Sequence, residues 1–194
     1  MEYGVVSGKL PWTAEDRISL KPLCYRDVFN LPRIDGLIVE FGVGSGATLR
    51  TFAGMIGDHK IYGFDWFQGL PEDWNATFTK GSLANPGYAS AQWPANSELV
   101  VGLIQDTLVG FLETHPEPIA YAHLDFDLYS STKFVLDHIQ DRLRPGTILH
   151  FDEIKNYQGC DHEIRAFNEY LESSGTSWNI VGQVTSPDGI FVML

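Results

Sequence analysis

Four carboxylates in two short segments are the residues of this chain best suited to chemistry. Asp125 and Asp127 lie in HLDFDLYSST, and Asp152 and Glu153 lie in LHFDEI. Both segments begin as apolar strands, and neighbouring parallel strands bring their carboxyl ends to one rim of a sheet. Carboxylates crowded there repel one another unless protons or a cation intervene, and oxygen ligands favour a hard ion, with Mg²⁺ before Ca²⁺ or Mn²⁺. The alternative is that Asp127 caps the following helix and Glu153 faces solvent.

A glycine-rich turn is the second feature that could do chemistry. Residues 37–47 read LIVEFGVGSGA, an apolar strand that runs directly into Gly42, Gly44 and Gly46. A turn without Cβ atoms lets the backbone approach a ligand closely and lets a helix begin beside it. This pattern is typical of sites for nucleotide-type cofactors. It does not choose between them, because Gly42-x-Gly44-x-x-Ala47 also satisfies the loose dinucleotide fingerprint.

Residues at or just after the ends of the first three expected strands are candidates for binding the rest of such a cofactor. Glu40 could meet an ammonium group, directly or through water, and Asp65 could accept hydrogen bonds from both hydroxyls of a ribose. Trp66, which follows Asp65, is also predicted to bind the cofactor. After the third strand, Asp106 opens a helix where an adenine ring would lie, and N-capping by Asp106 or Thr107 is the alternative there.

Strands alternate with helices along most of the chain. Apolar segments predict strands at 37–41, 60–64, 98–104, 119–125 and 147–151, and helical patterns occupy 46–56, 129–143 and 161–173. This alternation implies parallel strands joined by right-handed crossovers, with helices on both faces. Near the C-terminus, SWNIVGQV and IFVML flank TSPDG and predict an antiparallel hairpin. The expected fold is α/β, a Rossmann-like and mostly parallel sheet closed by a C-terminal antiparallel hairpin.

Two segments fall outside this alternation. Residues 66–94 show no sustained period and are rich in Gly, Pro, Asn and Ser, which is typical of a lid or a substrate-binding loop. The aromatic residues of this loop could stack on a ligand or pin the loop onto the core. Residues 1–36 predict a helical N-terminal lid segment, opened by a capping box at Thr13-x-x-Asp16 and interrupted at Pro22.

Size and charge restrict the class of protein. A chain of 194 residues that is 44% hydrophobic fits a single domain over 1–194. Its net charge of −12 repels nucleic acids and anionic membranes, so neither is an expected partner. We expect a cytoplasmic protein, because we find no signal-peptide pattern and no segment apolar enough to span a membrane. Cys24 and Cys160 lie far apart and suggest neither a disulfide framework nor a zinc site.

Several of these segments resemble the macrocin O-methyltransferase-like family, whose members are S-adenosylmethionine enzymes of antibiotic-sugar tailoring. The similarity covers residues 37–171 through the motifs GLIVEFGVGSGATLR, FDWFQGLPEDW, VVGLIQDTL, HLDFDLYSSTKFVL, RLRPGTILHFDEI and NYQGCDHEIRAFNEYL. It implies a class I methyltransferase fold, with the glycine turn under the methionine part of S-adenosylmethionine and Asp65 on its ribose. The family is generally longer at the N-terminus than this chain.

The resemblance also implies a metal-assisted mechanism. Asp125, Asp152 and Glu153 correspond to the metal ligands of the family, which usually has two Asp residues where this chain has Asp152 and Glu153. A divalent cation such as Mg²⁺ would bind two neighbouring oxygens of a small hydroxylated acceptor, and Asp127 would remove the proton. His162 is the alternative base.

The other histidines and two further functions complete the expectations. His123 and His150 lie inside strand patterns and are expected in the core. An NAD-dependent oxidoreductase also agrees with the glycine turn, and a non-catalytic cofactor-binding module could retain the same fold. Aromatic residues in the 66–94 loop could serve a homo-oligomer.

Overall fold

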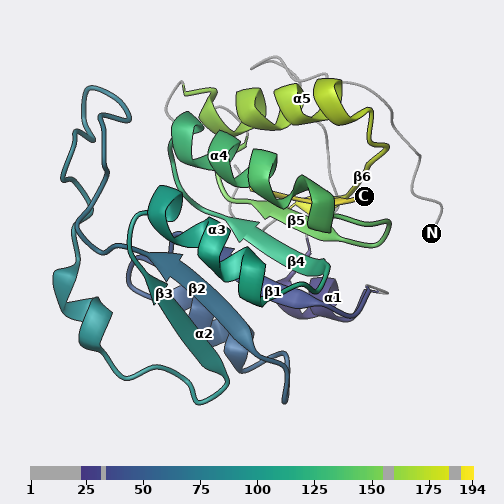
Figure 1. The fold of residues 1–194 in the computed structure, drawn as a ribbon, viewed down its shortest axis with the longest axis horizontal. Coiled ribbons are helices and arrows are strands. Elements are labelled where there is room, and N and C mark those ends of the chain that lie inside the picture. Colours follow the sequence, from purple (N-terminus) through teal and green to yellow (C-terminus); the bar gives the residue numbers. More distant parts are fainter. Residues whose placement is uncertain (1–22, 32–33, 155–159, 184–188) are drawn as a thin grey trace.

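The described residues form a seven-stranded sheet. The structure, a computed structural model, describes residues 23–31, 34–154, 160–183 and 189–194 (Figure 1). The strand order is β3-β2-β1-β4-β5-β7-β6, and the strands are β1 (Leu37–Phe41), β2 (Ile61–Asp65), β3 (Ser97–Val101), β4 (Ile119–Leu124), β5 (Ile148–Phe151), β6 (Asn179–Gln183) and β7 (Ile190–Met193). Strands β1 to β5 pair in parallel, whereas β7 runs antiparallel to both β5 and β6. The predicted α/β sheet with a C-terminal antiparallel hairpin is therefore confirmed.

Helices cover both faces of the sheet, as expected. One face packs against α3 (Ile104–Thr114), α4 (Tyr129–Ile139) and α5 (His162–Ser174), and the other packs against α1 (Tyr25–Phe29) and α2 (Ala47–Ala53) (Figure 1). Strand β1 shows how the sequence produces this arrangement, because successive side chains of a strand point to opposite faces. Leu37, Val39 and Phe41 join the core on the α3–α5 side, and Ile38 joins the core on the α1–α2 side.

Some element bounds differ from the predicted ones. The third strand ends at Val101 instead of 104, because Gly102 adopts a φ of +150° and α3 begins at Ile104. The helix expected over 129–143 is α4, followed by a 3₁₀ turn over Gln140–Arg142. The helix after the glycine turn is shorter than expected and starts directly behind Gly46, its N-cap.

Two regions of the prediction are only partly covered. The capping box at Thr13-x-x-Asp16 and Pro22 lie outside the described residues, as does most of the TSPDG turn. The 66–94 loop is described and contains only a short 3₁₀ helix, Pro86–Ser90. Cys24 and Cys160 are free thiols. None of the described helices is long and apolar enough to cross a membrane.

Candidate active site

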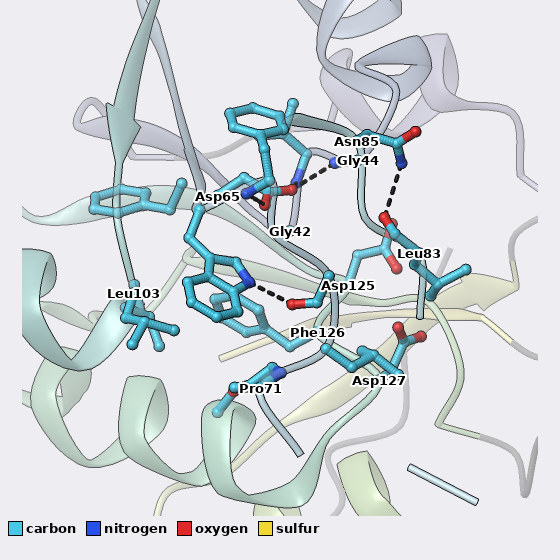
Figure 2. Close-up of a pocket in the computed structure, with 18 of the residues that line it drawn as sticks. Gly42, Gly44, Asp65, Pro71, Leu83, Asn85, Leu103, Asp125, Phe126 and Asp127 are labelled. Carbon is cyan, nitrogen blue, oxygen red and sulfur yellow. Dashed lines mark hydrogen bonds between the residues drawn. The ribbon is translucent and has the colours of Figure 1, made fainter. Parts of the chain in front are cut away.

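A cavity of about 450 Å³ lies at the carboxyl ends of β1, β2 and β4. The glycine turn and the start of α3 line one part of it, and carboxylates that follow β4 and β5 line another. The 66–94 loop supplies much of the remaining wall, through Trp66, Phe67, Gly69, Leu70, Pro71, Trp74, Phe78, Leu83 and Asn85. In the view of Figure 2, Leu103 and Asp127 lie on opposite sides of the cavity. The strand ends expected to carry function thus open into one shared space.

Two glycines of the turn have left-handed backbone conformations, and one of them packs closely on another segment. Gly42 has a φ of +87° and Gly44 a φ of +51°, both in the left-handed region that favours glycine. A Cβ atom on Gly42 would overlap the carbonyl oxygen of Asp125. A Cβ atom on Gly44 would have no described atom within 4 Å, because this part of the turn faces the cavity. The turn therefore rests directly on the chain segment that carries the carboxylates.

Gly42→Ala should destabilise the protein by about 3 kcal/mol, because it adds an overlap with backbone to an unfavourable φ. The free energy of unfolding in urea measures the effect. Gly44→Ala is the matched control, since it has open space and carries only the left-handed strain of about 1–2 kcal/mol. Equal losses for the two variants would contradict the packing of Gly42 on Asp125.

Asp65 ties the glycine turn to the start of the 66–94 loop. Its Oδ2 atom accepts hydrogen bonds from the backbone amides of Val43 at 3.0 Å and Gly44 at 2.7 Å, and its Oδ1 atom accepts one from Phe67 at 2.7 Å (Figure 2). The carboxylate also lines the cavity. Its predicted ribose contact would be made by a group that already holds the turn in shape.

Three other predicted cofactor residues lie in different surroundings. Trp66 lines the cavity, and its indole N–H donates to the carbonyl of Gly69. Asp106 is exposed on the first turn of α3 and is not part of the cavity wall, whereas its neighbour Gln105 is. N-capping by Asp106 or Thr107 is not observed either, because Leu103 is the N-cap residue of α3, and the Thr107 hydroxyl donates instead to the Leu103 carbonyl at 3.0 Å. Glu40 is buried, does not line the cavity and faces His123.

A cluster of carboxylates forms the acceptor side of the cavity. Asp125, Asp127 and Glu153 all line it, and each offers an oxygen within 4.8 Å of the others. Burial raises the pKa of Asp125 well above its usual range, and the neighbouring carboxylates raise it further. Burial, and then the charge of Asp127 and a hydrogen bond to it, raises the pKa of Glu153 to about 11. Burial also raises the pKa of Asp127. Without a cation, protons must relieve this cluster.

Asp152 does not line the cavity, and one of its oxygens faces a buried histidine. The Oδ1 atom of Asp152 lies 3.8 Å from Nε2 of His123. Asp152, His123 and His150 each offer a possible metal-binding atom within 4.8 Å of the others. The predicted ligand set was Asp125, Asp152 and Glu153, and in this arrangement Asp127 stands beside Asp125 and Glu153 in the place expected of Asp152. The charge of Asp152 still raises the pKa values of Asp125 and Asp127, so the four carboxylates share one electrostatic environment.

The simpler interpretation of these acids is wrong. Asp127 does not cap α4, because Leu128 is the N-cap residue and no side chain caps it there. Glu153 is half-buried at the cavity wall, with its Oε2 atom buried, instead of fully facing solvent. Asp127 instead adopts a φ of +63°, a left-handed conformation that Asp tolerates better than most residues. This conformation is sparsely populated, and it lies at the cavity wall.

His162 has a structural position beside Asp127. Its Nδ1 atom accepts a hydrogen bond from the backbone amide of Tyr129 at 3.1 Å, and the ring also hydrogen-bonds the backbone of Asp127. It is half-buried and does not line the cavity. Burial lowers its pKa, and the charge of Arg165 lowers it further. Of the two candidate bases, only Asp127 reaches the cavity.

The sequence did not indicate several residues of the site. Glu163 is 1% exposed, and its carboxylate accepts a hydrogen bond from the amide of Glu153 at 3.1 Å. Its position in the first turn of α5 gives no signal in the sequence. Asn85 lines the cavity as well, and no motif marks it within the 66–94 loop. Gln105, in contrast, lines the cavity in the segment Gln105-Asp106-Thr107, which the sequence places near an adenine ring.

The 66–94 loop is fixed to the core at both ends and in the middle. Phe67 is 2% exposed, and Trp74 packs with Leu70 and Leu128 in a small apolar cluster. Near the far end of the loop, the Arg50 guanidinium lies over the ring of Trp93 at 4.1 Å. Phe67 and Trp74 therefore hold the loop onto the core, and because both also line the cavity, stacking on a ligand stays a prediction.

Comparisons with known proteins identify relatives of the chain. A family model described as a methyltransferase domain matches residues 39–154. A solved structure of CalS11, a calicheamicin methyltransferase, superposes with a TM-score of 0.70 at 29% identity, over 87% of this chain and 75% of that chain.

Two further structures agree with this fold. An apo structure of CalS11, described as a TDP-rhamnose 3'-O-methyltransferase, gives a TM-score of 0.61 at 28% identity, with the same shares of the two chains. The O-methyltransferase NovP gives 0.60 at 21% identity, over 82% of this chain and 72% of that chain, a likeness of fold. No curated protein matches the chain significantly.

Proposed function

Because the chain belongs to the methyltransferase-domain family, whose model matches residues 39–154, we propose that it is an S-adenosylmethionine-dependent O-methyltransferase. Its acceptor would be a small molecule with a free hydroxyl, and its reaction would use a divalent cation. The observation that carries this proposal is the shared cavity, in which the turn at Gly42 rests on the backbone of Asp125. A cofactor on the turn and an acceptor at the carboxylates would meet there.

The acceptor class follows from the cavity and the relatives. CalS11, which is 28% identical in its apo structure, carries the description TDP-rhamnose 3'-O-methyltransferase. The acceptor side of this cavity combines carboxylates with the apolar side chains of Leu70, Trp74 and Phe78. We propose a sugar or another diol-like compound, since two neighbouring oxygens could face the carboxylates while the remainder packs on the loop.

The cofactor side would hold S-adenosylmethionine along the glycine turn. The open face of Gly44 leaves room for the methionine part, and Asp65 and Trp66 would lie near the ribose. Gln105 and Leu103 would flank the adenine, in place of the predicted Asp106. S-adenosylmethionine supplies the electrophilic methyl group on its sulfonium. The protein contributes orientation, which brings the acceptor oxygen in line with that methyl group.

The carboxylates fit a hard divalent cation such as Mg²⁺. The donor set consists of oxygen atoms, and Glu153 has a buried oxygen with no hydrogen-bond partner among the described residues. We propose Asp125, Asp152 and Glu153 as the ligands, with Asp152 binding through the carboxylate oxygen that does not face His123. When bound, a cation would lower the pKa of the acceptor hydroxyl. Asp127 would accept that proton, and its side chain first has to give up its hydrogen bond with Glu153.

Thermal shift with S-adenosylhomocysteine tests the cofactor. A ligand of the native state stabilises it by about 2.7 kcal/mol at a concentration of about 100 times its Kd. We expect S-adenosylhomocysteine to raise Tm and NAD⁺ to leave it unchanged. The reverse result would favour the NAD-dependent oxidoreductase.

A product assay tests the reaction. The protein is incubated with S-adenosylmethionine, Mg²⁺ and a panel of diols, sugars, TDP-rhamnose and phenols, and S-adenosylhomocysteine is measured. Product with at least one acceptor supports the enzyme. Cofactor binding without any product would favour the non-catalytic module.

The remaining expectations concern the setting of the protein. We propose that the domain spans 1–194, that the protein is cytoplasmic and that its net charge of −12 keeps it away from nucleic acids. A homo-oligomer through the 66–94 loop also stays a prediction, which the molar mass in solution can test.

A further inference from the structure

A row of buried polar side chains crosses the sheet near the carboxyl ends of its strands. The strand register pairs Glu40 of β1 with His123 of β4, and His123 with His150 of β5. Paired residues of neighbouring strands lie on the same face. Glu40 and His123 are 1% exposed and His150 is fully buried, in a layer that α1 and α2 cover. None of these side chains lines the cavity.

His123 lies between two carboxylates. Its Nδ1 atom is 3.9 Å from Oε1 of Glu40, and its Nε2 atom is 3.8 Å from Oδ1 of Asp152. The ring faces are taken up by the stacked ring of His150 at 4.1 Å and by Phe52 at 5.6 Å. No described group hydrogen-bonds the two ring nitrogens or the two carboxylate oxygens of Glu40 at normal length. The imidazole therefore bridges one residue of the cofactor strand and one of the acceptor rim.

His150 differs from His123 although it is equally buried. Its Nδ1 atom shares a hydrogen bond of 2.9 Å with the hydroxyl of Tyr121, and it contacts no carboxylate in this way. The two imidazole planes make an angle of only 11°. The lone pairs of an imidazole lie in the plane of its ring, and those of two stacked rings lie in separate, nearly parallel planes that do not meet near one ion, so His123, His150 and Asp152 are not arranged to share one metal ion. Of these two histidines, His123 is the one that lies between two carboxylates.

The burial of Glu40 agrees with a bridge. No other described group hydrogen-bonds the two carboxylate oxygens of Glu40, which are buried. A buried polar group without any partner is costly, so the ring of His123 is the neighbour that can hold Glu40 in place.

We propose that His123 is a positioning residue that joins the two halves of the active site, holding Glu40 for the cofactor and Asp152 for the cation. The inference rests on the proposed function, in which Asp152 would bind Mg²⁺, and on the sequence-based prediction that Glu40 meets the ammonium group of S-adenosylmethionine, directly or through water. Glu40 stands two residues before Gly42, and Asp152 stands directly before Glu153. Partners that orient metal-binding and ligand-binding groups in this way set affinity without touching the ligand.

Two conservative substitutions separate the two contacts. The amide of Asn reaches the position of Nδ1 in a histidine ring, and the amide of Gln reaches that of Nε2. His123→Asn should keep the contact with Glu40 and lose Asp152, so Mn²⁺ affinity falls about tenfold or more while S-adenosylhomocysteine affinity is nearly unchanged. His123→Gln should do the opposite, with an S-adenosylhomocysteine affinity about tenfold lower. Calorimetry for S-adenosylhomocysteine and electron paramagnetic resonance for Mn²⁺ measure the two affinities.

His150→Asn and His150→Gln are the matched controls, because His150 lies in the same buried row. Both should retain the two affinities, even if the loss of the bond to Tyr121 lowers Tm. Equal changes in both affinities for both His123 variants would overturn the proposal, because that pattern indicates a general structural effect. Losses in the His150 variants as large as those of the His123 variants would overturn it as well.

A measurement on the unmodified protein covers the case in which the variants do not fold. In ¹⁵N spectra of the histidine rings, the resonances of His123 should shift on addition of S-adenosylhomocysteine and again on addition of Mg²⁺, and those of His150 should shift less. Binding of both ligands without a response of His123 would overturn the bridge alone. If the protein bound neither ligand, the proposed function would fail, and the bridge with it.

Discussion

Replacing Asp127 with Asn should lower kcat by roughly 10²- to 10⁴-fold, which is the usual contribution of a general base. Asp127 is the candidate base that lines the cavity, and an amide cannot accept the proton from the acceptor hydroxyl. The affinities for S-adenosylhomocysteine and Mn²⁺ should be nearly unchanged, because Asp127 is not among the proposed ligands. Initial rates at saturating substrates, together with binding titrations, measure both effects.

Asn is the suitable replacement because of the backbone. The φ of +63° at Asp127 is one that Asn tolerates about as well as Asp, so the turn into α4 should persist. His162→Gln is the control, since its ring contacts the backbone of the same turn without reaching the cavity. A larger loss of kcat in His162→Gln than in Asp127→Asn would transfer the role of base to His162. Loss of Mn²⁺ affinity in Asp127→Asn would instead make Asp127 a ligand, as its position beside Glu153 allows.

Asp125→Asn should abolish cation-dependent turnover and reduce Mn²⁺ affinity by roughly 100-fold or more, beyond the effect of residues that only orient a ligand. Asp125 lies closest in sequence to the end of β4 and shares the cavity wall with Glu153. Asp152→Asn should act in the same direction. S-adenosylhomocysteine affinity should be kept in both variants, since the glycine turn contacts only the backbone of Asp125. Full activity of both variants in the presence of a chelator would exclude the metal mechanism.

The stability of Asp125→Asn offers an internal check. Burial and neighbouring carboxylates raise the pKa of Asp125, which means that its ionised form is unfavourable in the folded protein without a cation. An amide removes that cost, so the variant should melt at or above the temperature of the unmodified protein in chelator. Added Mg²⁺ should raise Tm of the unmodified protein only. A strong destabilisation of the variant in chelator would indicate that Asp125 has a structural role instead.

The sequence predicted the architecture well because the architecture depends on periodicity. Each strand of the parallel sheet appeared as an apolar segment, and the antiparallel hairpin followed from a change of pattern after α5. Bounds were less well predicted where a single residue decides them. Strand β3 ends at Val101, three residues before the expected position, because the backbone turns at Gly102, where φ is +150°. The apolar pattern of the sequence does not show such a backbone turn.

The site was predicted at the level of strand ends but not of side-chain direction. Asp152 and Glu153 are neighbours, and consecutive side chains of an extended chain point to opposite sides. Asp152 therefore follows His150 toward the buried row, whereas Glu153 turns to the cavity with Asp125 and Asp127. The same alternation could have indicated that Asp152 and Glu153 would have different neighbouring side chains. The bridge at His123 could not be found in this way, because it depends on three strands in register.

The way in which the 66–94 loop is fastened has a consequence for diversification of this enzyme. Phe67, Trp74 and Trp93 hold the loop at separate points, and Asp65 also accepts a hydrogen bond from the backbone amide of Phe67. The stretch around Leu83, which is 51% exposed and borders the cavity, is held through backbone hydrogen bonds, from the Leu70 amide to the Ser82 carbonyl at 2.8 Å and from the Asn85 amide to the Phe67 carbonyl at 3.0 Å, and these do not depend on the side chains of the stretch. Evolution or engineering can therefore exchange this tip to suit a new acceptor while the cofactor half keeps its shape. Modularity of that kind would let one scaffold serve many tailoring pathways.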